Sequence, residues 1–494
     1  MTQTREDVPL IFERSQPGRR GVTPPVTEGA PLETLLGREH LRSEPPRLPE
    51  VSELDLVRHY TNLAHRQFSI DGNVYPLGSC TMKYNPKVHE EAASLFSDVH
   101  PEQDDGSVQG TLGLLWHLAR DLSEITGMDQ VTLQPAAGAH GELTGILMIR
   151  AFHEANGEGA QRRTVIVPDA AHGTNPATAG MVGYDVVEVP TGEDGEVDVG
   201  ALRAALGPDT AAVMLTNPST VGIFEGRILE IAEAAHAVGA QVYYDGANLN
   251  AIVGKARPGD MGFDVVHLNL HKTFTTPHGG GGPGTGPVGV KAHLAPFLPG
   301  PVIEREGERY VVQEDRPNSV GRMRSHHGNV GNLVRAYAYI RSLGPDGLAD
   351  VAEKAVLNAN YLRKRLEEQG FSMAYDRTCM HEFVAQPPGE LRTLDLAKAL
   401  LDEGMHPMTV YFPLVVKEAM MVEPTETEAL ETLDAYAEAL GRVTRRAQQD
   451  AEWLAGAPYM TPVRRLDEVL AARTPILRWT PSEAVDAVQG EAAD

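Results

Sequence analysis

In the middle of the chain, the pattern of hydrophobic and polar positions predicts strands that alternate with helices. Between residues 131 and 290, short apolar runs alternate with longer segments whose apolar residues recur at helical spacing. Alternation of this kind predicts an α/β architecture, with a mainly parallel central sheet covered on both faces by helices. We expect helices at 112–126, which Gly127 ends, and at 227–238, with strands at 164–167, 185–189, 211–215, 241–244 and 264–270.

The pattern changes after Gly328. Longer amphipathic stretches now surround only short apolar runs, which predict strands near 380–385 and 408–412. This mixture predicts a smaller C-terminal α+β domain. Its expected helices lie at about 330–342, 346–369, 393–403 and 426–449.

Both ends of the chain are richer in proline than the middle. Residues 1–50 are also rich in charge, and we expect an extended arm that wraps a partner subunit. The segment from 455 onward is expected to be irregular. We therefore divide the chain into an N-terminal arm and extension (1–110), a large α/β domain (111–328), a small α+β domain (329–455) and a tail (456–494).

Lys272 is the first candidate for chemistry. It ends the apolar run from Asp264 and precedes a glycine-rich loop, Gly279–Gly284. A lysine at the end of a core strand is either desolvated enough to act as a free amine or neutralised by a covalent bond, and both states suit a Schiff-base lysine. For an isolated lysine, a side chain that reaches solvent from the strand end is the commoner case. The assignment therefore depends on the residues around Lys272.

Asp245 provides the first support, because it follows the apolar strand 241–244. The segment between Asp245 and Lys272 has room for a loop and one further strand, so acid and amine can lie at the ends of neighbouring strands. Ligands bind at this edge of open α/β sheets. Pyridoxal phosphate needs such a pair, an acid that keeps its pyridine nitrogen protonated and a lysine that binds its aldehyde. Taken alone, an aspartate at a strand end more often caps a turn.

Two loops add to this site. Residues 131–138 predict a short strand and a turn of small residues, and the helix that follows carries Leu143, Ile146 and Leu147 on one face. Backbone N–H groups at a helix start bind phosphate, although turns of this kind are common. His172 stands in the polar loop after strand 164–167, and its flat ring suits stacking on an aromatic cofactor. A hydrogen-bonded loop histidine is an equal alternative.

These segments, in this order, resemble those of the fold-type-I pyridoxal-phosphate enzymes, a transferase architecture. They resemble more closely subunit 2 of the glycine decarboxylase P-protein family of the glycine cleavage system. The resemblance runs from about residue 50 to 470. Its main motifs are Pro76-Leu-Gly-Ser79-Cys80-Thr81-Met-Lys83, Gln134-Pro-Ala-Ala-Gly-Ala-His140-Gly-Glu142, Asn269-Leu-His271-Lys272-Thr with Pro277-His278-Gly-Gly-Gly-Gly-Pro-Gly284, and Asp315-Arg-Pro-Asn-Ser-Val-Gly321.

The resemblance implies a reaction and a cofactor. Glycine would be decarboxylated with pyridoxal 5'-phosphate, and the aminomethyl group would pass to the lipoyl arm of the H-protein as carbon dioxide leaves. Lys272 would carry the cofactor, Asp245 would hold its ring nitrogen protonated, and His172 would stack on the ring. The remaining expected cofactor contacts are Ala137 and Gly138, through their N–H groups to the phosphate, and Asn269 and His271.

The substrate-binding residues stay open at this point. An arginine would hold the glycine carboxylate by two hydrogen bonds. The candidates for binding the carboxylate or lining the path to the site are Ser79, Thr81, Lys83, Arg322 and Arg324. No role is assigned to His140, His278, Cys80 or the glycine loop.

Composition limits the partners. The 494 residues are enough for two or more domains, and a net charge of −25 disfavours nucleic acid and anionic membranes as partners. No stretch reaches the ~18 apolar residues of a membrane span. The two cysteines fit a reducing compartment, so we expect a cytoplasmic protein. The resemblance implies pairing with P-protein subunit 1 in an α2β2 heterotetramer and docking of lipoylated H-protein.

The sequence predicts no metal site. His267 and His271 have the spacing of a metal pair on a helix, but the surrounding residues read as a strand. Four residues along a strand span about 13 Å, which is too far for one ion.

Two alternatives remain. Another pyridoxal enzyme of the same architecture, such as a cysteine desulfurase or an amino-acid decarboxylase, shares the lysine and the acid. A desulfurase needs a reactive cysteine on a mobile loop, and the chain offers Cys80 and Cys379. The chain can also be a non-catalytic scaffold subunit, but such a subunit is expected to lose Lys272 or Asp245, and both are present.

Overall fold

The structure is a computed structural model that describes residues 8–23, 25, 29–44, 46, 48–100, 103–279 and 284–478. It contains two compact units. The described parts of residues 1–65 and 450–494 form one unit, and residues 66–449 form the other. The second unit holds both of the larger sheets and every candidate site residue named above.

The central sheet of the described chain has seven strands in the order β1-β7-β6-β5-β4-β2-β3. The strands from β6 to β3 run parallel, and β7 is antiparallel to both of its neighbours. The expectation of a mainly parallel α/β sheet is therefore confirmed. The strands are β1 (Gln130–Thr132), β2 (Thr164–Pro168), β3 (Asp185–Val189), β4 (Thr210–Thr216), β5 (Gln241–Gly246), β6 (Val265–Leu268) and β7 (Val288–Val290).

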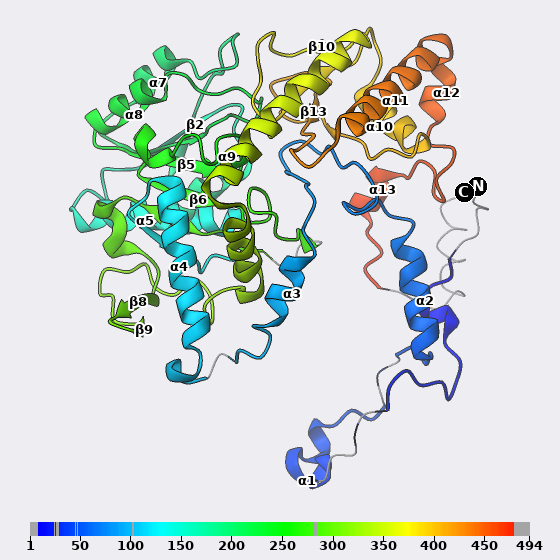
Figure 1. The fold of residues 1–494 in the computed structure, drawn as a ribbon, viewed down its shortest axis with the longest axis horizontal. Helices are drawn as coiled ribbons and strands as arrows, with labels where there is room; N and C mark the ends of the chain where they lie inside the picture. Colours follow the sequence, from blue (N-terminus) through cyan, green and yellow to red (C-terminus); the bar gives the residue numbers. More distant parts are fainter. Residues whose placement is uncertain are drawn as a thin grey trace. The chain divides into compact units, whose positions relative to one another are not determined.

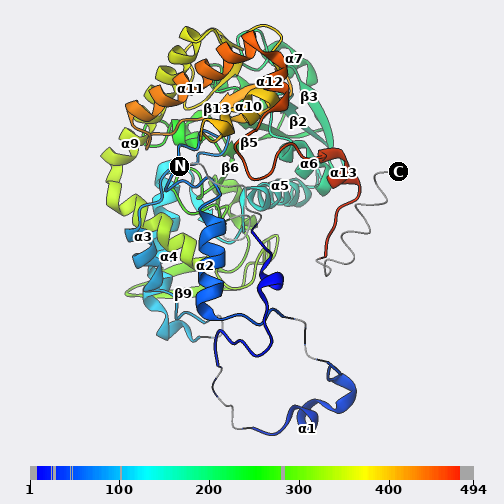
Figure 2. The same ribbon diagram turned by 90° about the vertical axis from the view of Figure 1, so that its right-hand side faces the viewer.

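Helices cover both faces of this sheet, because its central strands are apolar along their whole length. Every residue of β4 and β5 is buried. One apolar core packs beneath α4 (Gln109–Thr126), α7 (Val199–Ala205), α8 (Ile228–Ala237) and the first half of α9 (Val330–Glu368). The opposite core lies beneath α5 (Gly138–Ala155) and α6 (Thr174–Val182), which lie side by side (Figure 2).

A smaller antiparallel sheet lies in the C-terminal half, with the order β10-β11-β13-β12. It consists of β10 (Ser372–Met373), β11 (Phe383–Gln386), β12 (Thr409–Val410) and β13 (Met420–Val422). The helices α10 (Thr393–Asp402) and α11 (Leu430–Gln449) lie beside it (Figure 1). This arrangement matches the expected α+β character, while the proposed domain boundaries stay a prediction.

Several predicted boundaries are wrong for local reasons. The two helices expected at 330–342 and 346–369 form one element that breaks at Gly344, where φ is 64°, just before Pro345. The helix expected from 426 begins at Leu430, after Thr425 with a φ of 58°. The strand expected to reach 270 stops at Leu268, because Lys272 N–H closes a turn on the Asn269 carbonyl.

Other elements carried no recognised sequence signal. The β8–β9 hairpin (Val302–Glu306 and Arg309–Gln313) and α3 (Val88–Ser94) belong to the larger unit. In the smaller unit, α1 (Leu32–Leu36) interrupts the expected arm, and α2 (Glu53–Ala64) begins at a Ser52 cap. The helix α12 (Ala451–Gly456) ends where the irregular tail was expected to begin, and α13 (Glu468–Arg473) interrupts that tail. Among the described residues, no helix has the length and apolar character needed to cross a membrane.

Candidate active site

The two central candidates come from neighbouring parallel strands. Asp245 lies near the end of β5, and its register partner on β6 is His267. Lys272 follows β6 after a tight turn, so acid and amine lie at the carboxyl edge of one sheet. Asp245 is almost completely buried, and Lys272 is half-buried. Their electrostatic coupling is direct, since the Lys272 ammonium is among the groups that lower the pKa of Asp245.

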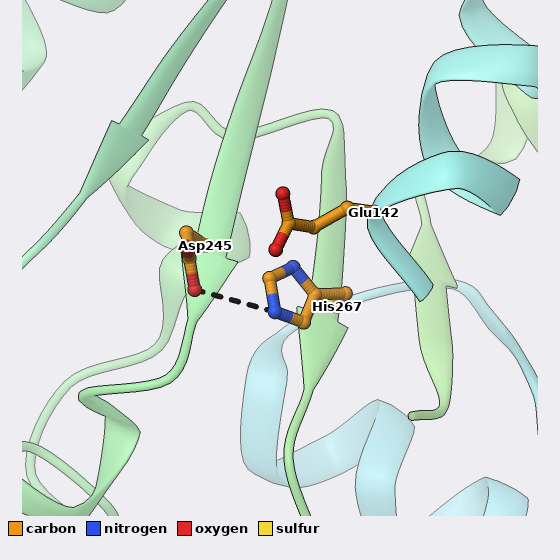
Figure 3. Close-up of side chains that lie close together, drawn as sticks. All are labelled: Glu142, Asp245 and His267. Atoms are coloured by element: carbon orange, nitrogen blue, oxygen red, sulfur yellow. Dashed lines mark ion pairs between the residues drawn. The ribbon is translucent and has the colours of Figure 1, made fainter. Parts of the chain in front are cut away.

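Asp245 is surrounded by donors. His267 Nε2 lies 3.2 Å from Asp245 Oδ1 (Figure 3). The Asn175 amide donates to Oδ2 at 3.0 Å, and the Ala247 N–H donates to Oδ1 at 3.0 Å. Burial alone would raise the pKa of Asp245. The nearby His267, the two hydrogen bonds and Lys272 together hold it below its ordinary value, so the carboxylate is ionised at neutral pH.

Glu142 completes this group from the first turns of α5 (Figure 3). Its carboxyl accepts from Thr174 Oγ1 at 2.7 Å and from the Asn175 amide at 2.9 Å. Burial and the neighbouring Asp245 raise the pKa of Glu142 to about 7. Two buried carboxyl groups this close cannot both ionise cheaply, and the surrounding donors favour the charge on Asp245.

His172 is attached to the same network. Its Nδ1 lies 2.8 Å from Thr174 Oγ1, which in turn donates to Glu142. His172 is exposed, and the edge of its ring meets Phe412 with the centroids 5.8 Å apart. Desolvation lowers the pKa of His172, Asp245 raises it and Lys272 lowers it. A chain of contacts thus runs from the His172 ring to the Asp245 carboxylate.

The Lys272 amine has no fixed partner. Within the described ranges it makes no hydrogen bond or ion pair. Beyond the effect of burial, its charge acts on titratable groups from several parts of the chain, namely Cys80, Glu142, His172, Asp245, His267, His271, His278, His381, Glu382 and Glu423. An unpaired amine at the centre of these groups is available to react.

The predicted anion site lies at the start of α5. Ala137 is extended, and the helix begins at Gly138, so the N–H groups of its first turn have no partner within the helix. The Asn269 amide packs against Gly138 so closely that a Cβ there would lie 2.2 Å from Asn269 Oδ1. A larger residue at Gly138 would displace the Asn269 side chain, so glycine here keeps that amide beside the unpaired N–H groups of the helix start.

His271 and His278 lie edge to face, with their ring centroids 4.8 Å apart. Burial lowers the pKa of His271 to about 3 and that of His278 to about 4, so both rings are neutral. The glycine loop between Gly279 and Gly284 falls on residues 280–283, which lie outside the described residues.

The substrate candidates occupy three different environments. Ser79 and Thr81 bind two buried carboxyl groups and are considered below. Lys83 is buried, and its ammonium is fully engaged by Glu426 Oε1 at 2.7 Å, Asn250 Oδ1 at 2.8 Å and the Tyr339 hydroxyl at 3.1 Å. Its three donors are filled, so Lys83 has none left for a ligand.

Arg322 and Arg324 differ in whether their donors are already used. Arg322 is exposed and pairs with Glu314 at 2.8 Å. Arg324 is half-buried, and its guanidinium makes no hydrogen bond or ion pair with the part of the chain that the structure describes. Burial lowers the pKa of His140, in the first turn of α5, and Arg324 lowers it further. Of the two, Arg324 is the one with free donors near the anion site.

Two groups of buried side chains lie close enough to share an ion, Glu142 with Asp245 and His267, and His381 with Glu382 and Glu423. The expectation of no metal site stays a prediction. His267 was considered above as a possible metal ligand with His271. It contacts Asp245 instead, and its Nδ1 is hydrogen-bonded to the Tyr243 hydroxyl at 2.8 Å. A polar residue within an otherwise apolar strand was the available signal.

Comparisons with known proteins agree on one family. Residues 351–455 match the model of the glycine dehydrogenase C-terminal domain. A probable glycine dehydrogenase (decarboxylating) subunit 2 from Thermus thermophilus is 64% identical over 95% of this chain and 99% of the relative. A protein of the same description from Listeria innocua is 55% identical over 96% of this chain and 98% of the relative.

Solved structures share the fold. A glycine decarboxylase (P-protein) of the glycine cleavage system superposes with a TM-score of 0.71 at 23% identity, covering 83% of this chain and 94% of that one. A cysteine desulfurase from Thermococcus onnurineus gives 0.61 at 15% identity, covering 76% and 96%. At such identities the match concerns the fold-type-I architecture, whereas the sequence relatives fix the family. The chain belongs to the family of glycine dehydrogenase (decarboxylating) subunit 2.

Proposed function

We propose that this chain is the glycine-cleaving subunit of the glycine cleavage system P-protein. With pyridoxal 5'-phosphate it decarboxylates glycine, releases carbon dioxide and passes the aminomethyl group to the lipoyl arm of the H-protein. The observation that carries the proposal is the unpaired Lys272 beside the ionised Asp245, at the edge of one sheet in a chain that is 64% identical to a subunit 2 relative.

The residues present fit the cofactor. The turn before α5 offers unpaired N–H groups for a phosphate. The segment that contains Gly286 is joined to this turn, because the Gly286 N–H donates to Pro135 O at 2.9 Å. Beside this contact, Thr285 Oγ1 is buried without a partner among the described residues, as is Thr273 Oγ1 next to the lysine. We assign the aldehyde to Lys272, the phosphate to the Ala137–Gly138 turn with Asn269 and the neighbouring His271, and the ring to His172 and Asp245.

When bound, pyridoxal phosphate supplies an electron-accepting ring that takes up the electron pair released as the substrate carboxylate leaves. Asp245 holds the proton on the ring nitrogen, because an ionised carboxylate in a buried site attracts that proton strongly. His267, Asn175 and the Ala247 N–H keep Asp245 ionised and aimed. The His172 ring, held through Thr174, would pack against the cofactor ring and restrain it.

The desulfurase alternative is less favoured. Burial raises the pKa of Cys80 to about 11 and that of Cys379 to about 12. Both thiols are therefore protonated at neutral pH, whereas a nucleophilic cysteine needs thiolate character. The scaffold alternative is also less favoured, because Lys272 and Asp245 are both retained in a working arrangement.

The proposal includes the setting of the reaction. A subunit 2 requires a subunit 1, and we assign the pair to an α2β2 heterotetramer that receives lipoylated H-protein in the cytoplasm. The relatives' description as subunit 2 supports the pairing.

The activity can be measured with the assembled enzyme, both subunits together with H-protein. Glycine-dependent exchange of labelled bicarbonate into the glycine carboxyl group should occur in wild type and be lost in Lys272→Ala. Sulfide release from cysteine should be absent from both. Sulfide release by the wild type without bicarbonate exchange would establish the desulfurase alternative and overturn the proposal.

A further inference from the structure

A second pair of buried carboxyl groups lies at the edge of the small sheet. Glu382 immediately precedes β11, and Glu423 immediately follows β13. These strands are antiparallel, with Phe383 paired to Val422, so the same register continued by one residue places the two glutamates opposite each other. Neither side chain is exposed to solvent.

A loop from the N-terminal part of the unit crosses this edge. Leu77 forms a bridge with Val422, and the Glu423 N–H donates to Pro76 O at 3.2 Å. Gly78 then passes over β13, where a Cβ would lie 2.2 Å from Met421 Cγ and 2.7 Å from its backbone. The lack of a side chain at Gly78 brings the next residues directly onto the two carboxyl groups.

Three hydrogen bonds join the loop to the carboxyl pair. The Ser79 N–H donates to Glu382 Oε2 at 2.7 Å, and the Thr81 N–H donates to Glu423 Oε2 at 2.7 Å. The Thr81 hydroxyl donates to Glu423 Oε1 at 2.5 Å. Both glutamates thus bind backbone N–H groups more than three hundred residues away in the sequence.

The loop has an unfavourable backbone. Ser79 has a φ of 64° and Thr81 a φ of 47°, in the left-handed region that residues with a Cβ disfavour, above all a β-branched threonine. Such a conformation persists only where surrounding contacts fix it. The two glutamates make the contacts that fix this one, on both sides of Cys80.

The loop faces the reacting amine. Beyond the effect of burial, the Lys272 charge acts on Cys80, Glu382 and Glu423. Direct contacts support this position, because the Thr275 hydroxyl donates to Tyr84 O at 2.6 Å and the Asn85 amide donates to Thr275 O at 2.8 Å, which joins the chain just after the loop to the chain just after Lys272.

The carboxyl pair contributes geometry more than charge. Burial raises the pKa of Glu382 and Glu423, the latter to about 7. The neighbouring Glu423 raises the pKa of Glu382 further, and Glu426 raises that of Glu423. His381 does not neutralise them, since its Nε2 lies 3.8 and 3.9 Å away, beyond hydrogen-bonding distance. A protonated carboxyl group has one acceptor and one donor, the same arrangement as a glutamine amide.

We propose that Glu382 and Glu423 are positioning residues that hold the Ser79–Thr81 loop in its left-handed conformation beside Lys272 and so shape the substrate end of the site. The inference rests on the proposed function, which makes Lys272 the reacting amine. Neither glutamate touches the reacting atoms; each acts through the loop.

Two conservative variants of Glu423 separate geometry from charge. Glu423→Gln keeps the side-chain length and can still accept from the Thr81 N–H and pair with its hydroxyl. Glu423→Asp keeps the titratable carboxyl group but is one methylene too short to reach both. At pH 7, with subunit 1 and H-protein present, Gln should retain kcat/KM for glycine within about threefold of wild type, and Asp should lose roughly 10- to 100-fold.

Glu428 supplies the matched control, because it is a half-buried carboxyl in the same segment whose side chain makes no hydrogen bond within the described residues. Glu428→Gln and Glu428→Asp should both behave as wild type. The proposal is overturned if Glu423→Asp is as active as wild type, or if Glu423→Gln is as impaired as Glu423→Asp.

Hydrogen exchange without cofactor tests the loop by itself. In the assembled enzyme stripped of cofactor, amide exchange in the peptide that contains Ser79 and Thr81 should be about tenfold faster in Glu423→Asp and unchanged in Glu423→Gln. Equal exchange in all three proteins would overturn the inference whatever the activities are. This readout does not use Lys272, so it stands apart from a failure of the proposed function.

Discussion

The two buried groups that face Lys272 have similar compositions, but only the first of them holds a carboxyl group whose pKa is lowered. At the edge of the central sheet, Glu142, Asp245 and His267 come together, and the pKa of Asp245 lies below its ordinary value. At the edge of the small sheet, His381, Glu382 and Glu423 come together, and the pKa values of both glutamates lie above theirs.

The difference lies in the donors. Asp245 has an amide, a backbone N–H and the lysine around it, and a histidine nitrogen lies 3.2 Å away. The two glutamates share the lysine, the loop and the Asn248 amide, which donates to Glu382 Oε1 at 3.3 Å, but their histidine is too far away to bond. Burial has the same sign in both groups, so the donor set decides which carboxyl carries a charge. One group therefore acts by charge and the other by shape.

The largest effect should follow loss of the charged acid. Asp245→Asn keeps the shape of the side chain but cannot hold a proton on the ring nitrogen, and we expect kcat for glycine to fall about 10²- to 10³-fold. Steady-state bicarbonate exchange measures this. Asp185→Asn, in the exposed first position of β3, is the control and should match wild type. Near-normal turnover by Asp245→Asn would show that catalysis does not need a charge on this residue.

Protein stability should respond to pH in opposite directions in the two groups. The folded-state pKa of Asp245 is depressed, so its contribution is present above the unfolded pKa and is lost as pH falls through the folded value. Glu423 has a folded pKa raised from 4.5 to about 7, so its contribution to stability is present below pH 4.5, is lost as pH rises to about 7, and changes no further at higher pH.

The free energy of unfolding of Glu423→Gln, relative to that of wild type, should therefore be larger at pH 8 than at pH 5 by roughly 1–3 kcal/mol. Asp245→Asn should lose stability at both pH values. Thermal unfolding of the cofactor-free proteins at the two pH values tests the contrast, and the same sign for both variants would contradict it.

A smaller effect should follow from removing a donor to the charged group. Asn175 binds both Glu142 and Asp245, so Asn175→Ala should raise the pKa values of both carboxyl groups. The acid limb of the kcat/KM profile should move to higher pH, with about a tenfold loss at the wild-type optimum. An unmoved limb would mean that other donors are sufficient to keep Asp245 ionised.

The smallest effect concerns Cys80. Its pKa of about 11 reflects burial first, then opposing contributions from Lys272, which lowers it, and from Glu423 and Glu382, which raise it. Alkylation by iodoacetamide at pH 8 should be slow in wild type and rise roughly two- to fivefold in Glu423→Gln. Peptide mass spectrometry measures it, with Cys379 as the reference thiol. Fast alkylation of Cys80 in wild type would show that this thiol is reactive and would support the desulfurase alternative.

The sequence predicts one of these groups better than the other. The positions of Asp245 and Lys272 can be predicted because each residue follows an apolar run, and the carboxyl ends of parallel strands lie at one edge of the sheet. The roles of Glu142, Asn175 and His267 depend on the register of β5 with β6 and on the approach of α5, which local patterns do not contain. For Lys83, sequence reasoning could not reveal that three partners already occupy its ammonium.

The small-sheet group was missed altogether for the same reason. Its hydrogen bonds join residues more than three hundred positions apart, through strands only two to four residues long. A strand that short gives no reliable periodicity. The signal that could have been used is chemical, a glutamate beside an apolar run at the end of each of two strands, where a buried carboxyl needs a donor from elsewhere.

The most direct test of the central claim is reduction of the cofactor-loaded enzyme with borohydride, followed by peptide mapping. Reduction fixes the bond between the cofactor aldehyde and its lysine. We expect the pyridoxyl group on the peptide that contains Lys272, and we expect Lys272→Ala to lack both this label and the visible absorbance of the bound cofactor. A label on another lysine, or unchanged absorbance in Lys272→Ala, would contradict it.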